Sequence, residues 1–191
     1  MKRCFALSLA VLFLMGVTAV AADRELYGVT FPGEKIVDGK KLTLNGVACL
    51  KKFGFVKVYV GGLYLENPTK DPREVIESEQ IKQFDLRYLT DKATAKKLQE
   101  GFVELIADNN PPELVKAHKA DIDTYVSWFD KDMAPGKTSV TTYRPGVGLT
   151  LEWQEEMKGT MPGSEFAQMY FRYTFGDKAD QGLKKAYLGL E

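Results

Sequence analysis

The sequence predicts an α+β fold built on one large, mostly antiparallel sheet. Strand-like segments occur in two blocks, and each block is followed by helix-like segments, an order typical of a sheet layered with helices. Turn sequences at Asp38-Gly39 and Arg144-Pro145-Gly146 separate neighbouring strand-like segments, which predicts antiparallel hairpins. Residues 55–65 form the longest strand-like run and are largely apolar on both faces, so we expect a central strand covered on both sides.

The first 22 residues have the features of a secretory signal peptide. Lys2 and Arg3 form a basic start, an apolar run covers residues 4–17, and Ala19-Val20-Ala21 gives the small-x-small pattern that signal peptidase recognises. The apolar run is shorter than the roughly 20 residues of a membrane-spanning helix. We therefore expect cleavage after Ala21 or Ala22, a periplasmic location without stable membrane insertion, and one mature domain of residues 23–191.

Composition narrows the function classes. Without Lys2 and Arg3 the mature chain carries 24 basic and 26 acidic residues, a formal charge of −2 with neither sign concentrated. This argues against nucleic acid or an anionic membrane as the main partner. Cys49 would be the one cysteine left after cleavage, which excludes an intrachain disulfide and a cysteine metal cluster. We predict no metal and no cofactor.

Alternation of apolar and polar residues locates the strands. The expected strands cover residues 27–31, 36–37, 42–44, 55–65, 84–88, 139–143, 147–153 and 156–160. Pro32-Gly33 turns the chain after the first of them, and Asp71-Pro72 is expected in a loop.

The central strand carries two polar side chains that need an explanation. Strict alternation places Lys57, Tyr59 and Gly61 on one face and the valines at 56, 58 and 60 on the other. An ammonium and a phenol on a covered face need partners, a ligand or water. Alternatively, Lys57 extends to the edge of the sheet and Tyr59 is an ordinary core tyrosine.

Helical periodicity predicts four helices. The first follows Thr90 as N-cap, the second carries an apolar stripe from Leu114 to Phe129, the third follows Pro162-Gly163-Ser164 and ends at Gly176, and a short terminal helix covers residues 180–188.

Two sets of helical residues could bind a ligand. His118, the one histidine, lies within the apolar stripe of the second helix, where it is either a hydrogen-bonded boundary residue or a proton-transfer or haem-binding residue. Tyr125, Tyr170 and Tyr173 belong to a cluster of aromatic residues in the later half of the chain. These aromatics form either plain core or an apolar pocket with hydroxyl groups inside.

Several stretches resemble the chalcone isomerase family. The segment 55–66, FVKVYVGGLYLE, is similar to its F-x-K-x-x-x-x-G-x-Y-L-E stretch, and residues 44–48 are similar to its glycine-rich turn. Residues 128–149 resemble its F-x-P-G-x-S-x-x-Y-R…G-x-L passage. The resemblance covers nearly the whole mature domain and is greatest to exported bacterial chalcone isomerase-like proteins. It implies an open-faced β-sandwich, with a large antiparallel sheet layered with helices and a ligand cleft between them.

The resemblance does not extend to the catalytic residues. In the plant enzymes an arginine of the glycine-rich turn stabilises the substrate oxyanion, and a threonine and a tyrosine orient a water. Here the arginine position falls at Leu50 or Lys51, the threonine position at Tyr59, the pocket position of the last long helix near Tyr173, and the tyrosine position near Leu114. Because such residues act as a unit, the fold is implied but the activity is not.

We therefore predict a periplasmic, non-catalytic binding protein for an apolar or amphiphilic small molecule, since the family also contains fatty-acid binders. Lys57 or Lys51 would meet a carboxylate and Tyr59 would donate a hydrogen bond. The complete predicted set of ligand-binding residues is Lys51, Lys57, Tyr59, His118, Tyr125, Tyr170 and Tyr173.

Three alternatives remain open at the level of sequence. The first is an isomerase, an intramolecular lyase of the chalcone isomerase type, in which Tyr59 and Lys51 stabilise the oxyanion. The second is a haem carrier that uses His118 or a tyrosine. The third is a partner-binding module without a small ligand.

Overall fold

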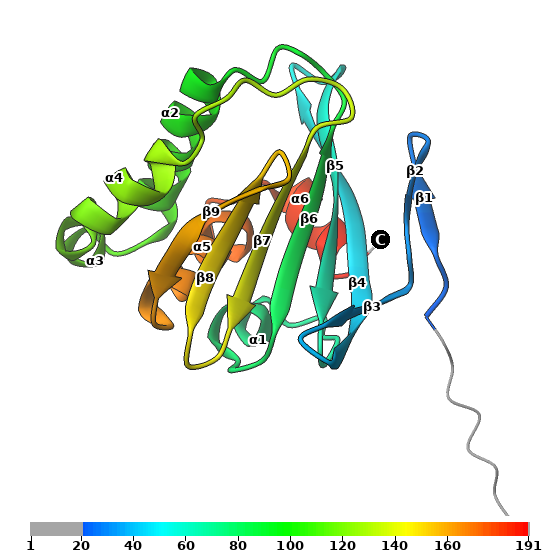
Figure 1. Cartoon of the computed structure of the whole chain (residues 1–191), viewed down its shortest axis with the longest axis horizontal. Coiled ribbons are helices and arrows are strands. Elements are labelled where there is room, and N and C mark those ends of the chain that lie inside the picture. The colour runs from blue at the N-terminus through cyan, green and yellow to red at the C-terminus, as the bar shows by residue number, and fades with distance from the viewer. Residues whose placement is uncertain (1–20, 191) are drawn as a thin grey trace, which may run out of the picture.

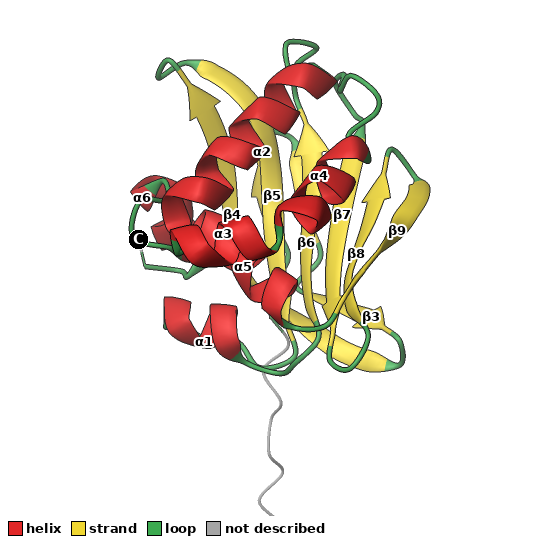
Figure 2. Ribbon diagram, turned by 90° about the vertical axis from the view of Figure 1, so that its left-hand side faces the viewer, coloured by secondary structure: helices red, strands yellow, loops and turns green. Residues whose placement is uncertain are grey.

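The fold is a seven-stranded antiparallel sheet with helices on one face and a small hairpin on the other. The computed structural model describes residues 21–190, so the predicted signal peptide lies almost wholly outside the described residues. The sheet runs in chain order from β3 to β9, and β1 pairs only with β2. Figure 1 shows α2 to α4 on one side of the sheet and the β1–β2 hairpin on the other, and Figure 2 shows the helices lying over the strands.

The strands and helices cover most of the described chain. The strands are β1 (Arg24–Leu26), β2 (Val29–Phe31), β3 (Glu34–Val37), β4 (Lys40–Lys52), β5 (Val56–Leu65), β6 (Lys82–Tyr88), β7 (Thr138–Arg144), β8 (Gly148–Trp153) and β9 (Glu156–Pro162). The helices are α1 (Pro72–Glu77), α2 (Ala95–Asn109), α3 (Pro112–Ala117), α4 (Lys119–Ser127), α5 (Glu165–Phe175) and α6 (Gln181–Tyr187). The predicted α+β class with a large antiparallel sheet is confirmed.

Two apolar clusters lie on the two faces of the sheet. The larger one, on the helix face, joins side chains such as Leu63 and Phe84 to α2, α4, α5 and α6. The smaller one, on the outer face, joins Val60 and Tyr64 of β5 to Phe31 of the β1–β2 hairpin. The β5 strand is therefore covered on both sides, as its apolar sequence predicts.

Several element boundaries differ from the sequence prediction. Residues 27–31 do not form one strand, because Tyr27 and Gly28 have positive φ and form the turn between β1 and β2. The sequence at Asp71-Pro72 starts α1 instead of a loop, since the Asp71 carboxylate accepts a hydrogen bond from the N–H of Arg73 at 2.8 Å.

The two helix predictions in the middle of the chain also need correction. The N-cap of α2 is Thr94, because the Thr90 hydroxyl instead accepts a bond from Lys92 N at 3.2 Å in a local turn. The predicted single helix over residues 114–129 is broken into α3 and α4 at His118, where φ −97° and ψ 19° leave the helical region.

The segment predicted as a glycine-rich turn, residues 44–48, lies inside β4. A Cβ on Gly46 would lie only 2.3 Å from the carbonyl oxygen of Ala186, so glycine allows the end of α6 to pack directly on the strand. The side-chain amide of Asn45 donates to the carbonyl oxygen of Tyr187 at 2.8 Å and fixes this contact. The segment thereby holds Tyr187 against the sheet.

A β-bulge divides the central hairpin into two parts with opposite side-chain orientation. Leu50 pairs with Tyr59 and Lys51 pairs with Lys57, which leaves Val58 without an opposite residue. One extra residue in one strand moves the side chain of every following residue to the opposite face of the sheet. Tyr59 therefore lies on the helix face with Leu50, and Lys57 lies on the outer face with Lys51.

Candidate functional site

A cavity of about 80 Å³ lies between the helix face of the sheet and helices α2, α4, α5 and α6. Its polar lining consists entirely of hydroxyl groups apart from the indole of Trp153, whose N–H donates to the carbonyl oxygen of Lys131. The hydroxyl groups come from Tyr59, Tyr88, Tyr125, Ser139, Thr141, Tyr170, Tyr173, Thr174 and Tyr187.

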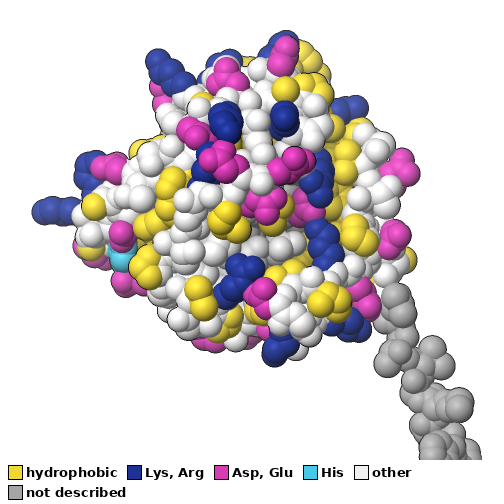
Figure 3. Space-filling model, viewed as in Figure 1, with side chains coloured by type: hydrophobic (Ala, Val, Ile, Leu, Met, Phe, Trp, Pro, Cys, Tyr) yellow, Lys and Arg dark blue, Asp and Glu magenta, His cyan; other side chains and the backbone are white. Residues whose placement is uncertain are grey.

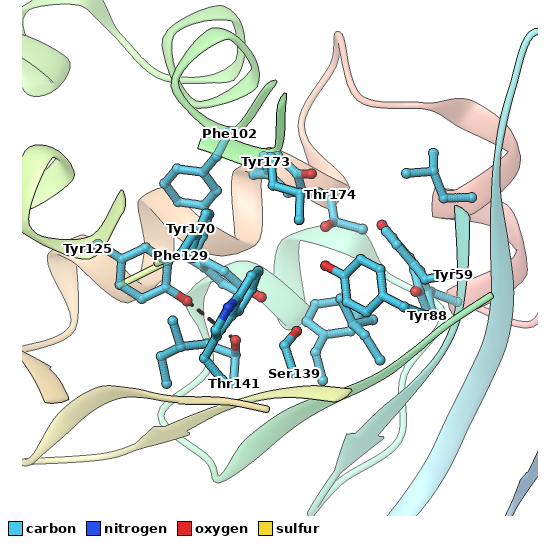
Figure 4. A pocket seen from close by; sticks show the side chains of 17 residues that line it. Tyr59, Tyr88, Phe102, Tyr125, Phe129, Ser139, Thr141, Tyr170, Tyr173 and Thr174 are labelled. Carbon is cyan, nitrogen blue, oxygen red and sulfur yellow. Dashed lines mark hydrogen bonds between the residues drawn. The ribbon is translucent and has the colours of Figure 1, made fainter. Parts of the chain in front are cut away.

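The positions of these side chains follow from alternation in the strands and spacing in the helices. Tyr88 is the cross-strand partner of Tyr59, and their rings meet edge to face with centroids 5.6 Å apart. Figure 4 shows this pair at one end of the cavity and Tyr125 with Phe102 at the other. Ser139 and Thr141 lie between the two ends on β7, where their short side chains leave space above the sheet.

The hydroxyl groups differ in how well they are bonded. Tyr125 and Thr141 lie 3.3 Å apart, oxygen to oxygen, and form a buried hydrogen bond. The buried hydroxyl of Tyr187 has no hydrogen-bond partner among the described residues. It lies against Gly61, where a Cβ would come within 2.4 Å of the phenolic oxygen, so the glycine of β5 makes room for it. A buried hydroxyl without a partner is costly unless a ligand or water bonds it.

Every phenol in the cavity is held in its neutral form. Burial raises the pKa of Tyr59, Tyr125 and Tyr187 far above the ordinary value, and burial raises the pKa of Tyr173 to about 12. None of the described residues that line the cavity carries a charge at neutral pH. The cavity therefore offers uncharged hydrogen-bond donors inside an aromatic shell.

The cavity is small compared with known ligand-binding cavities. Its volume is about half that of the roughly 150 Å³ cavity that accepts benzene in another protein, and ligand pockets commonly reach about 300–1,000 Å³. Leu98 and Phe102 of α2 close one side, and Leu98 is half-buried. A ligand longer than a few carbon atoms can enter only if side chains such as these move.

Four of the seven predicted ligand-binding residues line the cavity. They are Tyr59, Tyr125, Tyr170 and Tyr173. The sequence therefore identified part of a shared wall that comes from β5, α4 and α5.

Lys51 and Lys57 are not part of this wall. The bulge at Val58 turns both lysines to the outer face, where their ammonium groups lie 5.5 Å and 3.8 Å from the ring centre of Tyr27. The prediction that Lys57 and Tyr59 share a face is wrong, because strict alternation does not hold across a bulge.

His118 also lies away from the cavity, on the surface of the helical layer. Its Nδ1 is 2.7 Å from a carboxylate oxygen of Asp121 and its Nε2 is 2.8 Å from one of Glu165. These hydrogen bonds, Asp121 first, raise the pKa of His118. This geometry is that of a hydrogen-bonded boundary residue, one of the two roles expected for His118 from the sequence.

Five hydroxyl-bearing residues of the wall were not predicted from the sequence, and one of them, Thr174, directly follows the predicted Tyr173 on α5. Tyr88, Ser139 and Thr141 belong to strands that were predicted, and they lie on the same face as Phe84. The alternation of Phe84, Leu86 and Tyr88 was a usable signal for Tyr88. Tyr187 had no such signal, since its place depends on how α6 docks at Gly46.

Residues 21–190 contain no group of three or more His, Cys, Asp or Glu side chains placed to hold a metal ion. No described helix is both long and apolar enough to cross a membrane.

Comparison with known proteins gives one family and one fold. The family described as chalcone isomerase-like matches residues 23–189. Among solved structures, the Arabidopsis thaliana fatty-acid binding protein AtFAP1 matches with a TM-score of 0.67 and 16% sequence identity, over 84% of this chain and 92% of that one. At this identity the likeness shows the fold. No curated protein matches the sequence.

Proposed function

The chain belongs to the chalcone isomerase-like family, and from the chemistry of its cavity we propose that it is a non-catalytic binding protein for an amphiphilic small molecule with an acyl chain. The observation that carries the proposal is the lining: aromatic walls with neutral hydroxyl donors and no charged group among the described residues. The fatty-acid binding named for the AtFAP1 structure supports the ligand class.

The same lining indicates how the polar end of the ligand is held. A carboxylate placed among phenols without a cation is poorly stabilised, whereas a carbonyl, an ester, an alcohol or a protonated carboxylic acid is satisfied by hydroxyl donors. Tyr59, Tyr88 and Tyr187 offer such donors at one end of the cavity, and the hydroxyl of Tyr187 has no partner among residues 21–190. The ligand is therefore bound with an uncharged head group.

An isomerase with a rearranged site is less well supported. That alternative requires Lys51 beside Tyr59 to stabilise an oxyanion, and the bulge places Lys51 on the opposite face. The remaining phenols have raised pKa values and do not provide a base near neutral pH.

The first test identifies what the protein carries. Mass spectrometry of protein recovered from the periplasmic fraction, extracted with organic solvent, should detect a stoichiometric acyl-chain compound. N-terminal sequencing of the same sample tests the predicted export, for which we propose a mature start at Ala22 or Asp23. A start at Met1 in the membrane fraction would rule out cleavage.

The second test uses two tyrosines of one strand as a matched pair. Tyr59→Phe removes a hydroxyl from the cavity, and Tyr64→Phe removes the hydroxyl of another buried tyrosine from the outer face. A lost neutral hydrogen bond is worth about 0.5–1.5 kcal/mol, so Tyr59→Phe should weaken binding of a fluorescent acyl probe by about 2- to 12-fold. Tyr64→Phe should leave the affinity unchanged. Equal affinities for both variants would place the ligand elsewhere.

The third test examines the charge of the head group. A long-chain alcohol and its matching fatty acid should bind similarly at about pH 4 or below, while the acid should bind more weakly as the pH rises and its carboxyl group ionises. The titratable side chains that line the cavity are tyrosines with raised pKa values, so they do not titrate in this range. Affinity for the acid that is independent of pH would contradict the neutral head group but not the binding function.

A further inference from the structure

The turn between β4 and β5 projects two large aromatic side chains into solvent. Phe53 is 87% exposed and Phe55 is 78% exposed, the highest values among the large hydrophobic side chains of residues 21–190. Neither contributes to the two apolar clusters that hold the sheet. Folding therefore does not account for the choice of phenylalanine at these two positions.

The backbone conformation at position 53 is unfavourable for a phenylalanine. Phe53 and Gly54 both have positive φ, 54° and 77°, within the three-residue turn between Lys52 and its partner Val56. Asn, Asp or Gly is favoured at the first position, as in the turn Asp38-Gly39 of this protein, and a bulky residue there is strained. An exposed phenylalanine in a strained position indicates that the side chain serves an interaction.

Three lysines surround the aromatic pair. Lys51, Lys52 and Lys57 are exposed, and residues 51–57 contain no acidic residue. None of the three forms a salt bridge with a described residue; Lys51 and Lys57 instead lie near the ring of Tyr27. We call Tyr27, Phe53, Phe55 and these lysines the aromatic-lysine tip. Figure 3 shows hydrophobic and basic side chains together at the top of the molecule, the end where this hairpin lies, with single acidic side chains nearby.

The shape of the tip favours a lipid surface over a protein partner. Two aromatic side chains on a convex three-residue turn present at most about 300–500 Å², whereas a stable protein interface covers about 800 Å² on each partner. Aromatic side chains flanked by lysines suit the boundary between acyl chains and anionic head groups, where rings insert and ammonium groups meet phosphates.

We propose that the aromatic-lysine tip docks the protein on an anionic lipid bilayer, with Phe53 and Phe55 inserted at the head-group boundary and the three lysines against lipid phosphates. The net charge, 0 for the full sequence and −2 without Lys2 and Arg3, hides this local basic cluster, because the lysines are balanced by acidic residues elsewhere in the chain. Docking is peripheral and agrees with the absence of a spanning helix among residues 21–190.

Docking at this point would bring the cavity close to the membrane. Leu50, which lines the cavity and is half-buried, lies three residues before Phe53, a distance of roughly 10 Å along the strand. An acyl chain could then pass between bilayer and cavity with little exposure to water. The docking surface itself does not depend on this use.

Vesicle binding by the chain from Ala21 onward tests the proposal. This form contains every described strand and helix and lacks the apolar leader, which would itself bind lipid; circular dichroism and melting confirm that it is folded. Sucrose-loaded vesicles of phosphatidylcholine alone, or with one-third phosphatidylglycerol, are pelleted with the protein. We expect binding that requires phosphatidylglycerol and weakens with added salt.

The variants separate the tip from the rest of the surface. Phe53→Asn with Phe55→Thr should reduce the partition coefficient on the order of tenfold and leave folding intact, because asparagine suits the turn and threonine suits a strand. Lys51→Gln, Lys52→Gln and Lys57→Gln together should reduce it about 100-fold, since each lysine contributes about fivefold at an anionic surface.

Control variants remove one exposed apolar side chain or three exposed lysines elsewhere on the surface. Ile36→Thr removes a side chain that is 70% exposed on β3, and Lys70→Gln, Lys178→Gln and Lys185→Gln remove the same net charge at exposed sites. Both controls should bind like the wild type apart from the small effect of net charge. Equal loss in the control and tip lysine sets, equal binding to both vesicle types, or no binding at all would overturn the proposal.

A fluorescent reporter locates the tip directly. Both native tryptophans are at least partly buried, so Phe53→Trp adds an exposed one. Its emission should shift to shorter wavelength on binding to vesicles with phosphatidylglycerol. An unchanged emission maximum for a bound protein would show that another surface contacts the lipid.

Discussion

The two faces of the sheet differ in the polar groups that they bury: neutral hydroxyl groups on the helix face and a charged carboxylate on the outer face. On the helix face the hydroxyl-lined cavity is uncharged, and burial keeps its tyrosines neutral. On the outer face Lys35 and Arg87 both pair with Asp85, whose side chain is almost fully buried. Yet the same strands supply both faces: β5 places Tyr59 on one and Tyr64 on the other. The difference lies in access to solvent, because Lys35 and Arg87 keep part of their surface wet.

Lys82 is the exception on the helix face. It is 1% exposed, at the end of β6 away from the cavity, and its ammonium group donates to the carbonyl oxygens of Val75 and Ile76 at the end of α1. The rings of Tyr143 and Phe171 lie within 5 Å of it. A charge is tolerated on this face only where helix carbonyls and aromatic faces replace water.

The prediction with the largest expected effect tests the side-chain orientations of Val58 and Lys57 at the bulge. Val58 is buried in the helix-face cluster, so Val58→Asp should place an unpaired carboxylate in apolar surroundings. We expect a loss of several kcal/mol from a free energy of unfolding of roughly 5–15 kcal/mol. Lys57→Asp, one residue away but exposed, should change it by less than about 0.5 kcal/mol. Urea unfolding that gives similar losses for both variants would contradict the bulge.

The second prediction concerns Lys82. Burial lowers its pKa to about 8, so between about pH 8 and 10.5 the unfolded chain binds more protons at this position than the folded one. The free energy of unfolding should therefore rise with pH across this window, by an amount on the order of 3 kcal/mol at most. Lys82→Met should lack this rise.

Urea unfolding of wild type and Lys82→Met at about pH 7.5, 8.5 and 9.5 measures the effect as a difference between the two proteins. Staying below about pH 10 avoids ionisation of tyrosines in the unfolded chain. If the free energies of unfolding of the two proteins changed equally with pH, Lys82 would not be desolvated in the folded protein.

A third prediction concerns the ion pairs on the outer face. Asp85→Asn leaves Lys35 and Arg87 without their carboxylate, but both can turn toward water. We expect a loss of about 2 kcal/mol, between the values for exposed pairs and those for fully buried ones. Lys40→Met breaks the exposed pair with Glu66 and should cost less than about 1 kcal/mol. A thermal melt of each variant decides the order.

A feature of the fold or of the cavity could be predicted from the sequence when it depends on residues that are close together in the chain. The sheet, its hairpins at Asp38-Gly39 and residues 144–148, and the aromatic α5 follow from short-range patterns, so the sequence predicts them. The orientation of Lys57 does not, because the bulge at Val58 depends on how β4 and β5 pair. Tyr187 joins the cavity only through the contact of α6 with Gly46. Site residues were thus predicted where the pattern of a single strand or helix determines their position. They were missed where the position depends on how two strands pair or how a helix docks on the sheet.

The smallest expected effect concerns His118, at the surface of the helical layer, where it joins the α3–α4 junction to the start of α5. Its pKa is raised by Asp121 and Glu165, so its contribution to stability is complete below the unfolded pKa of about 6.5 and is lost as pH rises through the folded pKa. Both carboxylates are largely exposed, which limits the contribution to less than about 1 kcal/mol. Wild type should therefore exceed His118→Gln in free energy of unfolding at about pH 5.5, and the difference should shrink by about pH 8.5. Ligand affinity should not change, because His118 lies outside the cavity; a loss of affinity in this variant would return the histidine to the binding site.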